Sequence, residues 1–377
     1  MDFSLSEEQT MLADSITRFI DTDYDFAHRQ ENAGSEIGYS VEMWRTFADL
    51  GWTAVPFAEE DGGLDGGPIE QMLIMEQFGR GLVVEPYMAN VILAGGVLRR
   101  IANDEQKSNW LGPLIGGELQ ATLAFAEPQS RYNTANIVTT ARKDGDSYLL
   151  DEQKTLVLNG DTANLIIIPA RTSGNQSDET GITLFAVPGD ADGLNRKGYA
   201  TVDGLRAAEL HLDNVRVDAS NRLGEDDNGF PALSSVIDEA TLAISAEAMG
   251  IMQTMHDKTV EYSKNRVQFG VPISSFQALQ HRMVDTLMSC EQSRSLLYWG
   301  IMLSNSGDPE ANKAISALKY QVGIAGIKVA QEAVQIHGGM GVTWDLDIAH
   351  YFKRMTAIDL MFGNADHHLD RFMAFSS

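Results

Sequence analysis

The chain has 377 residues, with 28 basic and 53 acidic side chains, so its formal net charge is −25. This charge argues against nucleic acid and anionic membranes as partners, because both bind clustered lysine and arginine. A hydrophobic fraction of 44% is enough for large cores and excludes a disordered or low-complexity protein. The length predicts two or three domains.

Single features of the chain limit its environment further. Cys290 is the only cysteine, which excludes a disulfide framework and a cysteine-rich metal site. No stretch of about 18 apolar residues occurs, so no membrane span is expected. The acidic N-terminus lacks the apolar stretch of a signal peptide, and we therefore expect a cytoplasmic protein.

Residues 1–118 are expected to form an α-helical domain. Ser6–Gln9 has the pattern of a capped helix start, and apolar residues follow at roughly helical spacing. Further helical patterns cover 43–50, 69–78 and 89–101.

Residues 119–227 change to short, often alternating segments separated by turn signals such as Asp144-Gly145 and Asn159-Gly160. This pattern predicts antiparallel strands, and the lack of intervening helices argues against a parallel dinucleotide-binding sheet. The expected strands are Leu119–Ala126, Ile137–Arg142, Ser147–Leu158, Asn164–Ala170, Thr183–Pro188 and Glu209–Val217.

Residues 228–377 return to long helical patterns, which predict a C-terminal four-helix bundle. The expected helices are Phe230–Asn265, Phe276–Ser304, Pro309–His337 and a last one from Asp347. His367 and His368 read as part of a solvated turn, and we expect no metal site in the chain.

Glu247 is the one carboxylate in the stretch Ala240–His256, which contains no lysine or arginine. At helical spacing it falls on or beside an apolar stripe, where a carboxylate is poorly solvated. Such a group suits general-base chemistry near neutral pH. The alternative is a structural glutamate paired with a basic residue of a neighbouring helix.

Two further motifs offer groups that bind phosphate. Arg266–Ile273 follows the long helix and provides a guanidinium, an amide and an aromatic ring, although it also reads as an ordinary helix end. Gln335–Gly341 is glycine-rich, so its backbone N–H groups can approach a phosphate closely. Read alone, this second motif is more typical of a turn that ends a helix.

Taken together, these features resemble the acyl-CoA dehydrogenase family over the whole chain. The landmarks with family spacing are Phe3–Gln9, Pro56–Gly63, Ala124–Pro128, Asp203–Glu209, Arg266–Gly270 and Gln335–Gly341. Within the family, the chain looks most similar to the small-subunit type of pimeloyl-CoA dehydrogenase, on the basis of Pro56–Glu60, Gln129–Tyr132 and Asp203–Glu209.

The resemblance implies an α+β fold with an N-terminal helical domain, a middle antiparallel β-barrel and a C-terminal helical bundle. It implies FAD as cofactor, an acyl-CoA substrate oxidised to a trans-2-enoyl-CoA, an electron-transfer flavoprotein as acceptor, and a homo- or hetero-oligomer. The implied FAD-binding residues are Phe125, Ala126, Leu158, Arg266, Gln268, Phe269, Gln335, Gly338 and Gly339. The implied substrate-side residues are Asp238 and Thr241, with Arg131 as a candidate cation for a terminal carboxylate.

The chain departs from the family where the catalytic glutamate usually lies. Gly363 occupies that position, and Ala240 occupies an alternative position on the long helix, so neither can act as a base. A third family arrangement places the glutamate in an Ala-Glu-x-x-Gly pattern, which Ala246–Gly250 fits. Glu247 is therefore the expected α-proton base. Leu156, Leu158 and Ala126 replace the usual flavin-side Trp and Thr residues, so side-chain hydrogen bonds to the flavin are lost.

Three functional hypotheses remain open from the sequence. The first is an FAD-dependent acyl-CoA dehydrogenase that uses Glu247, with pimeloyl-CoA or another dicarboxylyl-CoA as a suggested substrate. The second is a non-catalytic or half-site subunit that completes the FAD site of a partner. The third is a relative of the same fold that carries out oxygen chemistry.

Overall fold

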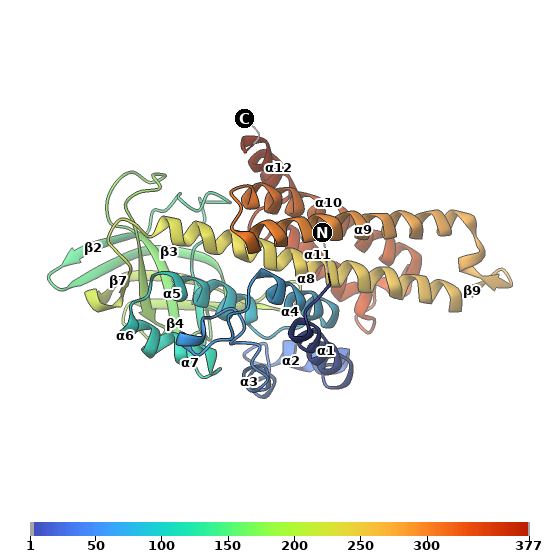
Figure 1. Ribbon diagram of the computed structural model, residues 1–377, viewed down its shortest axis with the longest axis horizontal. Helices are drawn as coiled ribbons and strands as arrows, with labels where there is room; N and C mark the ends of the chain where they lie inside the picture. The colour runs from blue at the N-terminus through green and yellow to red at the C-terminus, as the bar shows by residue number, and fades with distance from the viewer. Residues whose placement is uncertain (1–3, 376–377) are drawn as a thin grey trace. The chain divides into compact units, whose positions relative to one another are not determined.

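The computed structural model describes residues 4–375, so Phe3 of the N-terminal motif lies outside the described part. As predicted, helices precede a β domain, and helices follow it (Figure 1). The N-terminal α-helices are α1 (Glu7–Thr22), α2 (Phe26–Gly34), α3 (Val41–Asp49), α4 (Pro68–Gly81), α5 (Gly96–Ile101), α6 (Asp104–Gln106) and α7 (Gly112–Ile115). Shorter or irregular helical turns are η1 (Glu59–Asp61), the π-helices η2 (Met88–Gly95) and η3 (Lys107–Leu111), η4 (Ala219–Asn221), η5 (Ile273–Ser275) and η6 (Gly338–Val342).

The first helix begins where the sequence predicts. The Ser6 hydroxyl accepts a hydrogen bond from the backbone N–H of Gln9 at 3.1 Å, and the Gln9 amide oxygen accepts one from the N–H of Ser6 at 2.9 Å. This reciprocal capping satisfies two backbone donors that the first turn of a helix leaves without partners.

The middle of the chain forms one eight-stranded sheet in the order β6-β7-β3-β2-β4-β5-β8, with β1 added beside β4. Its pairings are antiparallel except β1–β4 and the single β2–β4 bridge, which are parallel. Alternate residues of the longer strands enclose a hydrophobic core that includes Leu150, Ile166, Phe185 and Leu210. The strands are β1 (Ala121–Leu123), β2 (Thr140–Asp144), β3 (Ser147–Leu158), β4 (Leu165–Arg171), β5 (Ile182–Pro188), β6 (Leu194–Ala200), β7 (Arg206–Asp218) and β8 (Arg222–Leu223).

The C-terminal part contains five α-helices where four were expected. They are α8 (Phe230–Asn265), α9 (Gln277–Ser306), α10 (Ala311–His337), α11 (Asp347–Leu360) and α12 (Ala365–Ala374). The last expected helix is broken because Phe362 and Gly363 take positive φ values of 56° and 112°. A two-stranded hairpin, β9 (Val267–Gln268) with β10 (Val271–Pro272), lies at the turn between α8 and α9 (Figure 1).

By contacts, the chain divides into two compact units. One contains Met1–Glu31, Gly67–Val83 and Thr241–Ser377, and the other contains Asn32–Gly66 and Val84–Ala240. The first unit therefore groups α1 and α4 with most of α8 and the helices that follow it.

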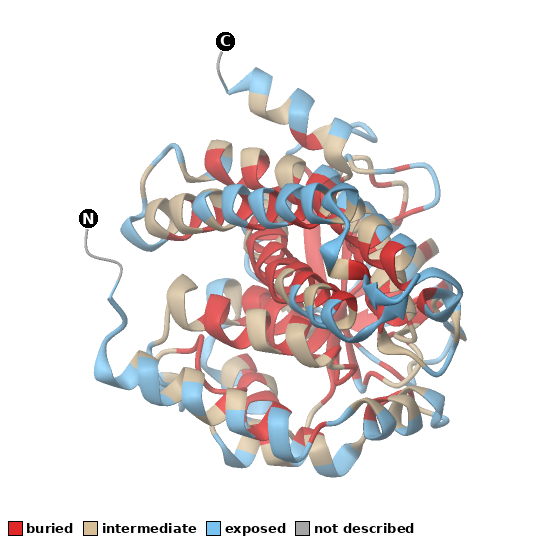
Figure 2. Ribbon diagram, turned by 90° about the vertical axis from the view of Figure 1, so that its right-hand side faces the viewer, coloured by how far each residue is buried: buried red, intermediate tan, exposed pale blue. Residues whose placement is uncertain are grey.

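Helix α8 is buried on every side along part of its length. Residues 240–252 are buried without a break (Figure 2), so this segment has no solvated face opposite an apolar stripe. Two glycines allow α4 to come very close to it. A Cβ at Gly79 would lie 2.0 Å from the carbonyl oxygen of Glu247, and a Cβ at Gly250 would lie 1.9 Å from that of Glu76.

No helix within residues 4–375 is both long and apolar enough to cross a membrane.

Candidate functional site

Glu247 is buried, with 5% of its surface exposed, and its carboxylate is paired with Arg354 of α11. Arg354 donates from Nε to Oε1 at 2.5 Å and from a terminal nitrogen to Oε2 at 2.8 Å, which is a bidentate pair. The stretch Ala240–His256 itself contains no lysine or arginine, and the compensating charge comes from Arg354, 107 residues further along the chain. The paired arrangement is the alternative that the sequence left open.

The loop around Gly363, where the resemblance places the usual base, has a fixed backbone. The buried Lys319 ammonium donates hydrogen bonds to the carbonyl oxygens of Ile358, Asp359 and Gly363 at 2.9, 3.0 and 2.7 Å. Burial lowers the pKa of Lys319 to about 8. A cation at the C-terminal end of a helix stabilises carbonyl groups that lack helical partners.

His368 holds the same loop from α12. Its Nε2 donates to the carbonyl oxygen of Phe362 at 3.0 Å, and burial together with the charge of Lys319 lowers the pKa of this imidazole to about 3. A Cβ at Gly363 would lie 2.5 Å from His367 and 2.7 Å from His368. The loop therefore requires glycine at position 363 for space as well as for its positive φ.

In the β domain, the structure brings together the residues expected beside the flavin. The Thr155 N–H donates to the carbonyl oxygen of Ala126 at 3.0 Å, and the Thr122 hydroxyl donates to that of Leu158 at 2.6 Å. Phe125, Ala126 and Leu158 are all half-buried. The end of β1 and the end of β3 thus form one surface.

A β-bulge next to this surface was not predicted. Thr155 and Leu156 of β3 stand opposite the single residue Glu209 of β7, and Leu156 has a φ of 50° with 48% of its surface exposed. A bulge of this kind redirects a side chain and is common near active sites. Alternation in the sequence predicts the strand but carries no signal for the extra residue.

Glu209 holds the bulge through its carboxylate. It accepts hydrogen bonds from the hydroxyl groups of Thr155 and Tyr199, both at 2.9 Å, and from the N–H of Leu156 at 3.4 Å. Burial opposes ionisation, yet these hydrogen bonds hold the pKa of Glu209 below its usual value. Burial and the adjacent carboxylate raise the pKa of Tyr199 to about 12.

Glu127, the glutamate that follows Ala126, is an internal anchor of the β domain. Its carboxylate accepts from Lys154 Nζ at 2.6 Å, from the Thr139 hydroxyl at 2.6 Å and from the Val138 N–H at 2.7 Å. Burial raises the pKa of a carboxyl group, but Lys154 and these donors more than compensate and lower that of Glu127. The network fixes the start of the turn that leads to Arg131.

The two motifs that offer candidate phosphate-binding groups, nearly 70 residues apart, are brought together in the C-terminal part. The ring of Tyr262 stacks on His337 with centroids 4.2 Å apart, and its hydroxyl donates to the His337 carbonyl oxygen at 3.4 Å. This contact places the β9–β10 hairpin close to the glycine turn after α10. Arg266, Gln268, Phe269, Gln335, Gly338 and Gly339 are all exposed.

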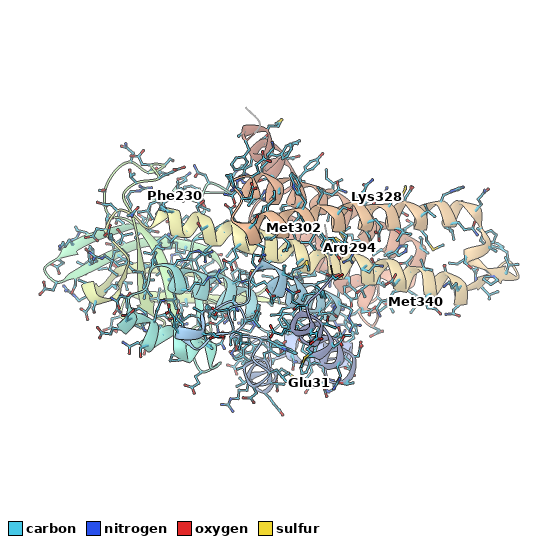
Figure 3. All side chains as sticks on the ribbon, viewed as in Figure 1. Glu31, Phe230, Arg294, Met302, Lys328 and Met340 are labelled. Carbon is cyan, nitrogen blue, oxygen red and sulfur yellow. The ribbon has the colours of Figure 1, made fainter. Side chains whose placement is uncertain are left out.

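The exposed groups of these motifs suit a phosphate. Arg266 has no ion-pair partner among residues 4–375. A Cβ at Gly338 or Gly339 would meet no atom within 4 Å, so their backbone is open to a ligand. Phe269 is 92% exposed with a φ of 53°, and Met340 (labelled in Figure 3) is 52% exposed.

The expected substrate-side residues differ in their surroundings. Asp238 and Thr241 lie one helical turn apart on α8 and are buried, with 6% and 1% of their surfaces exposed. Arg131 is exposed, so it is not the deep cation that a buried terminal carboxylate needs.

Comparisons with known proteins identify the class. Models of the acyl-CoA dehydrogenase N-terminal, middle and C-terminal domains match residues 6–118, 122–215 and 227–375. The chain belongs to the acyl-CoA dehydrogenase family and is an oxidoreductase that acts on CH–CH bonds.

Individual relatives match over nearly the full length. The probable acyl-CoA dehydrogenase YngJ of Bacillus subtilis (strain 168) is 29% identical over 371 residues, which cover 97% of each chain. The structure of butyryl-CoA dehydrogenase from Megasphaera elsdenii superimposes with a TM-score of 0.92 at 26% identity and covers 100% of both chains. A chain of the ChsE4–ChsE5 complex from Mycobacterium tuberculosis matches with a TM-score of 0.90 at 26% identity, covering 99% of this chain and 98% of that one.

Proposed function

We propose that this protein is an FAD-dependent acyl-CoA dehydrogenase that converts an acyl-CoA thioester to the trans-2-enoyl-CoA. The observation that carries the proposal is the match to all three domains of the family, in order and nearly without gaps. Bound FAD supplies the acceptor for the hydride that leaves the β-carbon of the substrate.

The residues of this chain fit that cofactor in two places. The open backbone at Gly338 and Gly339 and the unpaired Arg266 suit a pyrophosphate, because N–H groups and a guanidinium both donate to phosphate oxygens. The exposed Leu156 on its bulge, with Phe125 and Ala126 beside it, provides an apolar surface for a flat ring.

Within this proposal, Glu247 takes the α-proton of the substrate. Each carboxylate oxygen accepts one hydrogen bond from Arg354 and keeps a second lone pair that can take the proton. The two hydrogen bonds from Arg354 orient the carboxylate before that step. By resemblance, the family places its base at two other positions, which Gly363 and Ala240 occupy here, and the fit of Ala246–Gly250 to the third family pattern supports Glu247.

The direct test is loss of flavin colour on mixing with an acyl-CoA substrate under anaerobic conditions. Glu247→Gln keeps the shape of the side chain but cannot accept a proton, and we expect bleaching to slow by about 10²–10⁴-fold. Glu76→Gln is a matched control, because Glu76 pairs with Arg294 (labelled in Figure 3) at 2.8 Å and has no proposed role in the reaction. Bleaching of the Glu247→Gln variant at the rate of the control would exclude Glu247 as the base.

The substrate and partners belong to the same proposal. A dicarboxylyl-CoA such as pimeloyl-CoA rests on the sequence resemblance of Gln129–Tyr132 and its neighbours. We propose an electron-transfer flavoprotein as the electron acceptor and the cytoplasm as the location. A panel of mono- and dicarboxylyl-CoA esters, compared by bleaching rate, tests the substrate class.

The second candidate is a half-site subunit of a heteromeric dehydrogenase. The glycine at position 363 and the likeness to the ChsE4–ChsE5 complex both favour it. In that case the chain purified alone would be colourless, and co-expression with its partner would restore flavin binding. A yellow protein that bleaches on its own would exclude this candidate.

A further inference from the structure

Arg131 holds its backbone in a conformation that arginine rarely takes. Its φ is 48°, and it is the only lysine or arginine with a positive φ among residues 4–375. In this left-handed region the Cβ atom crowds the backbone, so residues other than glycine and asparagine are disfavoured. Strain of this kind persists where the surroundings enforce it, and it is concentrated at functional sites.

The turn that carries Arg131 is held firmly. The Ser130 N–H and hydroxyl donate to the Glu127 carbonyl oxygen at 3.0 and 2.9 Å, and the Asn133 N–H donates to that of Ser130 at 2.9 Å. The carboxylate of Glu127 is tied to the interior through the fully buried Lys154. The position of Arg131 is therefore set by the core of the β domain.

The guanidinium that this turn presents has no partner in the described part of the chain. Several arginines of the same unit do have one: Arg206 pairs with Asp161, and Arg222 pairs with Asp226. In a chain with a net charge of −25, an unpaired arginine on a rigid turn is a scarce group. Its exposed charge suits an anion that stays at the surface of the protein.

We propose that Arg131 binds a phosphate group of the CoA part of the substrate. The inference rests on the proposed function, and it goes further by assigning the guanidinium to the nucleotide end of the thioester. A terminal carboxylate buried with an acyl chain would need a buried cation, and Arg131 is exposed. Phosphates of CoA remain solvated, so an exposed guanidinium can pair with one at a small desolvation cost.

The test compares ligands that carry the same acyl-pantetheine part: the complete CoA ester, a form without the 3′-phosphate, and a form without the whole phosphorylated adenosine. Crotonyl-CoA, its 3′-dephospho form and crotonyl-pantetheine are titrated into the FAD-loaded protein by calorimetry. For Arg131→Gln we expect about tenfold weaker binding of crotonyl-CoA and no change for crotonyl-pantetheine. Arg142→Gln is the matched control, because Arg142 is exposed in the same unit but belongs to an ordinary strand.

A glycine variant separates binding from folding. Arg131→Gly removes the guanidinium and accommodates the positive φ, so we expect the same loss of crotonyl-CoA affinity without a lower melting temperature. A lower melting temperature with unchanged affinity would assign Arg131 a structural role and overturn the inference.

The remaining outcomes of these binding measurements also distinguish this inference from the proposed function. Arg131→Gln could remove a preference for pimeloyl-CoA over heptanoyl-CoA and leave crotonyl-CoA binding unchanged. In that case the guanidinium binds the terminal carboxylate of the acyl group, and the inference is wrong. If the wild type binds CoA esters and Arg131→Gln binds them equally well, only this inference fails. If the wild type binds no CoA ester, the proposed function fails with it.

Discussion

The contribution of the ion pair between Glu247 and Arg354 to stability can be measured with single and double substitutions of the two side chains. Arg354→Met removes the charge and keeps an apolar side chain in the space, while Glu247→Met does the same for the partner. The pair is bidentate, and its side chains are only 6% and 7% exposed. Either single change therefore leaves an uncompensated charge in the interior, whereas the double variant leaves none.

The size of the expected stability loss follows from the burial of both side chains. Removal of one partner of a buried pair costs about 3–5 kcal/mol, whereas replacement of both by apolar residues is often close to neutral. A coupling free energy of about 3 kcal/mol is expected for such a pair in contact. At roughly 2–4 °C for each kcal/mol in a domain of this size, Arg354→Met should lower the melting temperature by about 6 °C or more.

Differential scanning calorimetry of the wild type, the two single variants and the double variant gives the coupling. Flavin bleaching of the same four proteins then separates stability from chemistry. The double variant should melt near the wild type yet fail to bleach, because it folds without a base. Additive losses in the two single variants, or a drop of less than about 1 °C for Arg354→Met, would show that the buried pair does not stabilise the fold.

Two further predictions concern the loop around Gly363. Gly363→Glu should lower the melting temperature, because any Cβ at position 363 collides with His367 and His368. For the same reason it should fail to restore bleaching in the Glu247→Gln background. Recovered bleaching would show that this loop can still carry a base. The His368 pKa of about 3 in the folded chain implies that only the unfolded chain takes up this proton between pH 6.5 and 3, so stability falls as pH falls through that window. Urea midpoints at pH 7 and pH 4.5 should differ less for His368→Gln than for the wild type, and an equal pH dependence would contradict this assignment.

Local signals explain which parts of the fold were predictable. The start of α1 was visible because Ser6 and Gln9 satisfy a capping pattern, and β3 was visible from its alternation between turn signals. Strand β6, Leu194–Ala200, was missed because polar residues and a glycine separate Leu194 from Tyr199, and none of its residues at the end of the sheet is fully buried. An edge strand without a buried face has no period-2 apolar pattern to detect.

The candidate site shows the same division between local and distant information. The lack of other charges around Glu247 drew attention to it, but the partner Arg354 lies on another helix and no local spacing indicates the pair. The bulge at Leu156 depends on Glu209 of β7, four strands later in the sequence. The contact between Tyr262 and His337 likewise joins two motifs that periodicity treats separately.

The two glycines where α4 crosses α8 also restrict how this part of the molecule can move. The carbonyl oxygens of Glu76 and Glu247 occupy the space that a side chain at Gly250 or Gly79 would fill, so neither helix has a groove along which to slide. A shift by one residue would drive a Cβ atom into a backbone oxygen. We therefore expect α4 and the segment of α8 that carries Glu247 to move together, and rotation about the side-chain bonds of Glu247 to be the simplest way to change the position of its carboxylate relative to both helices.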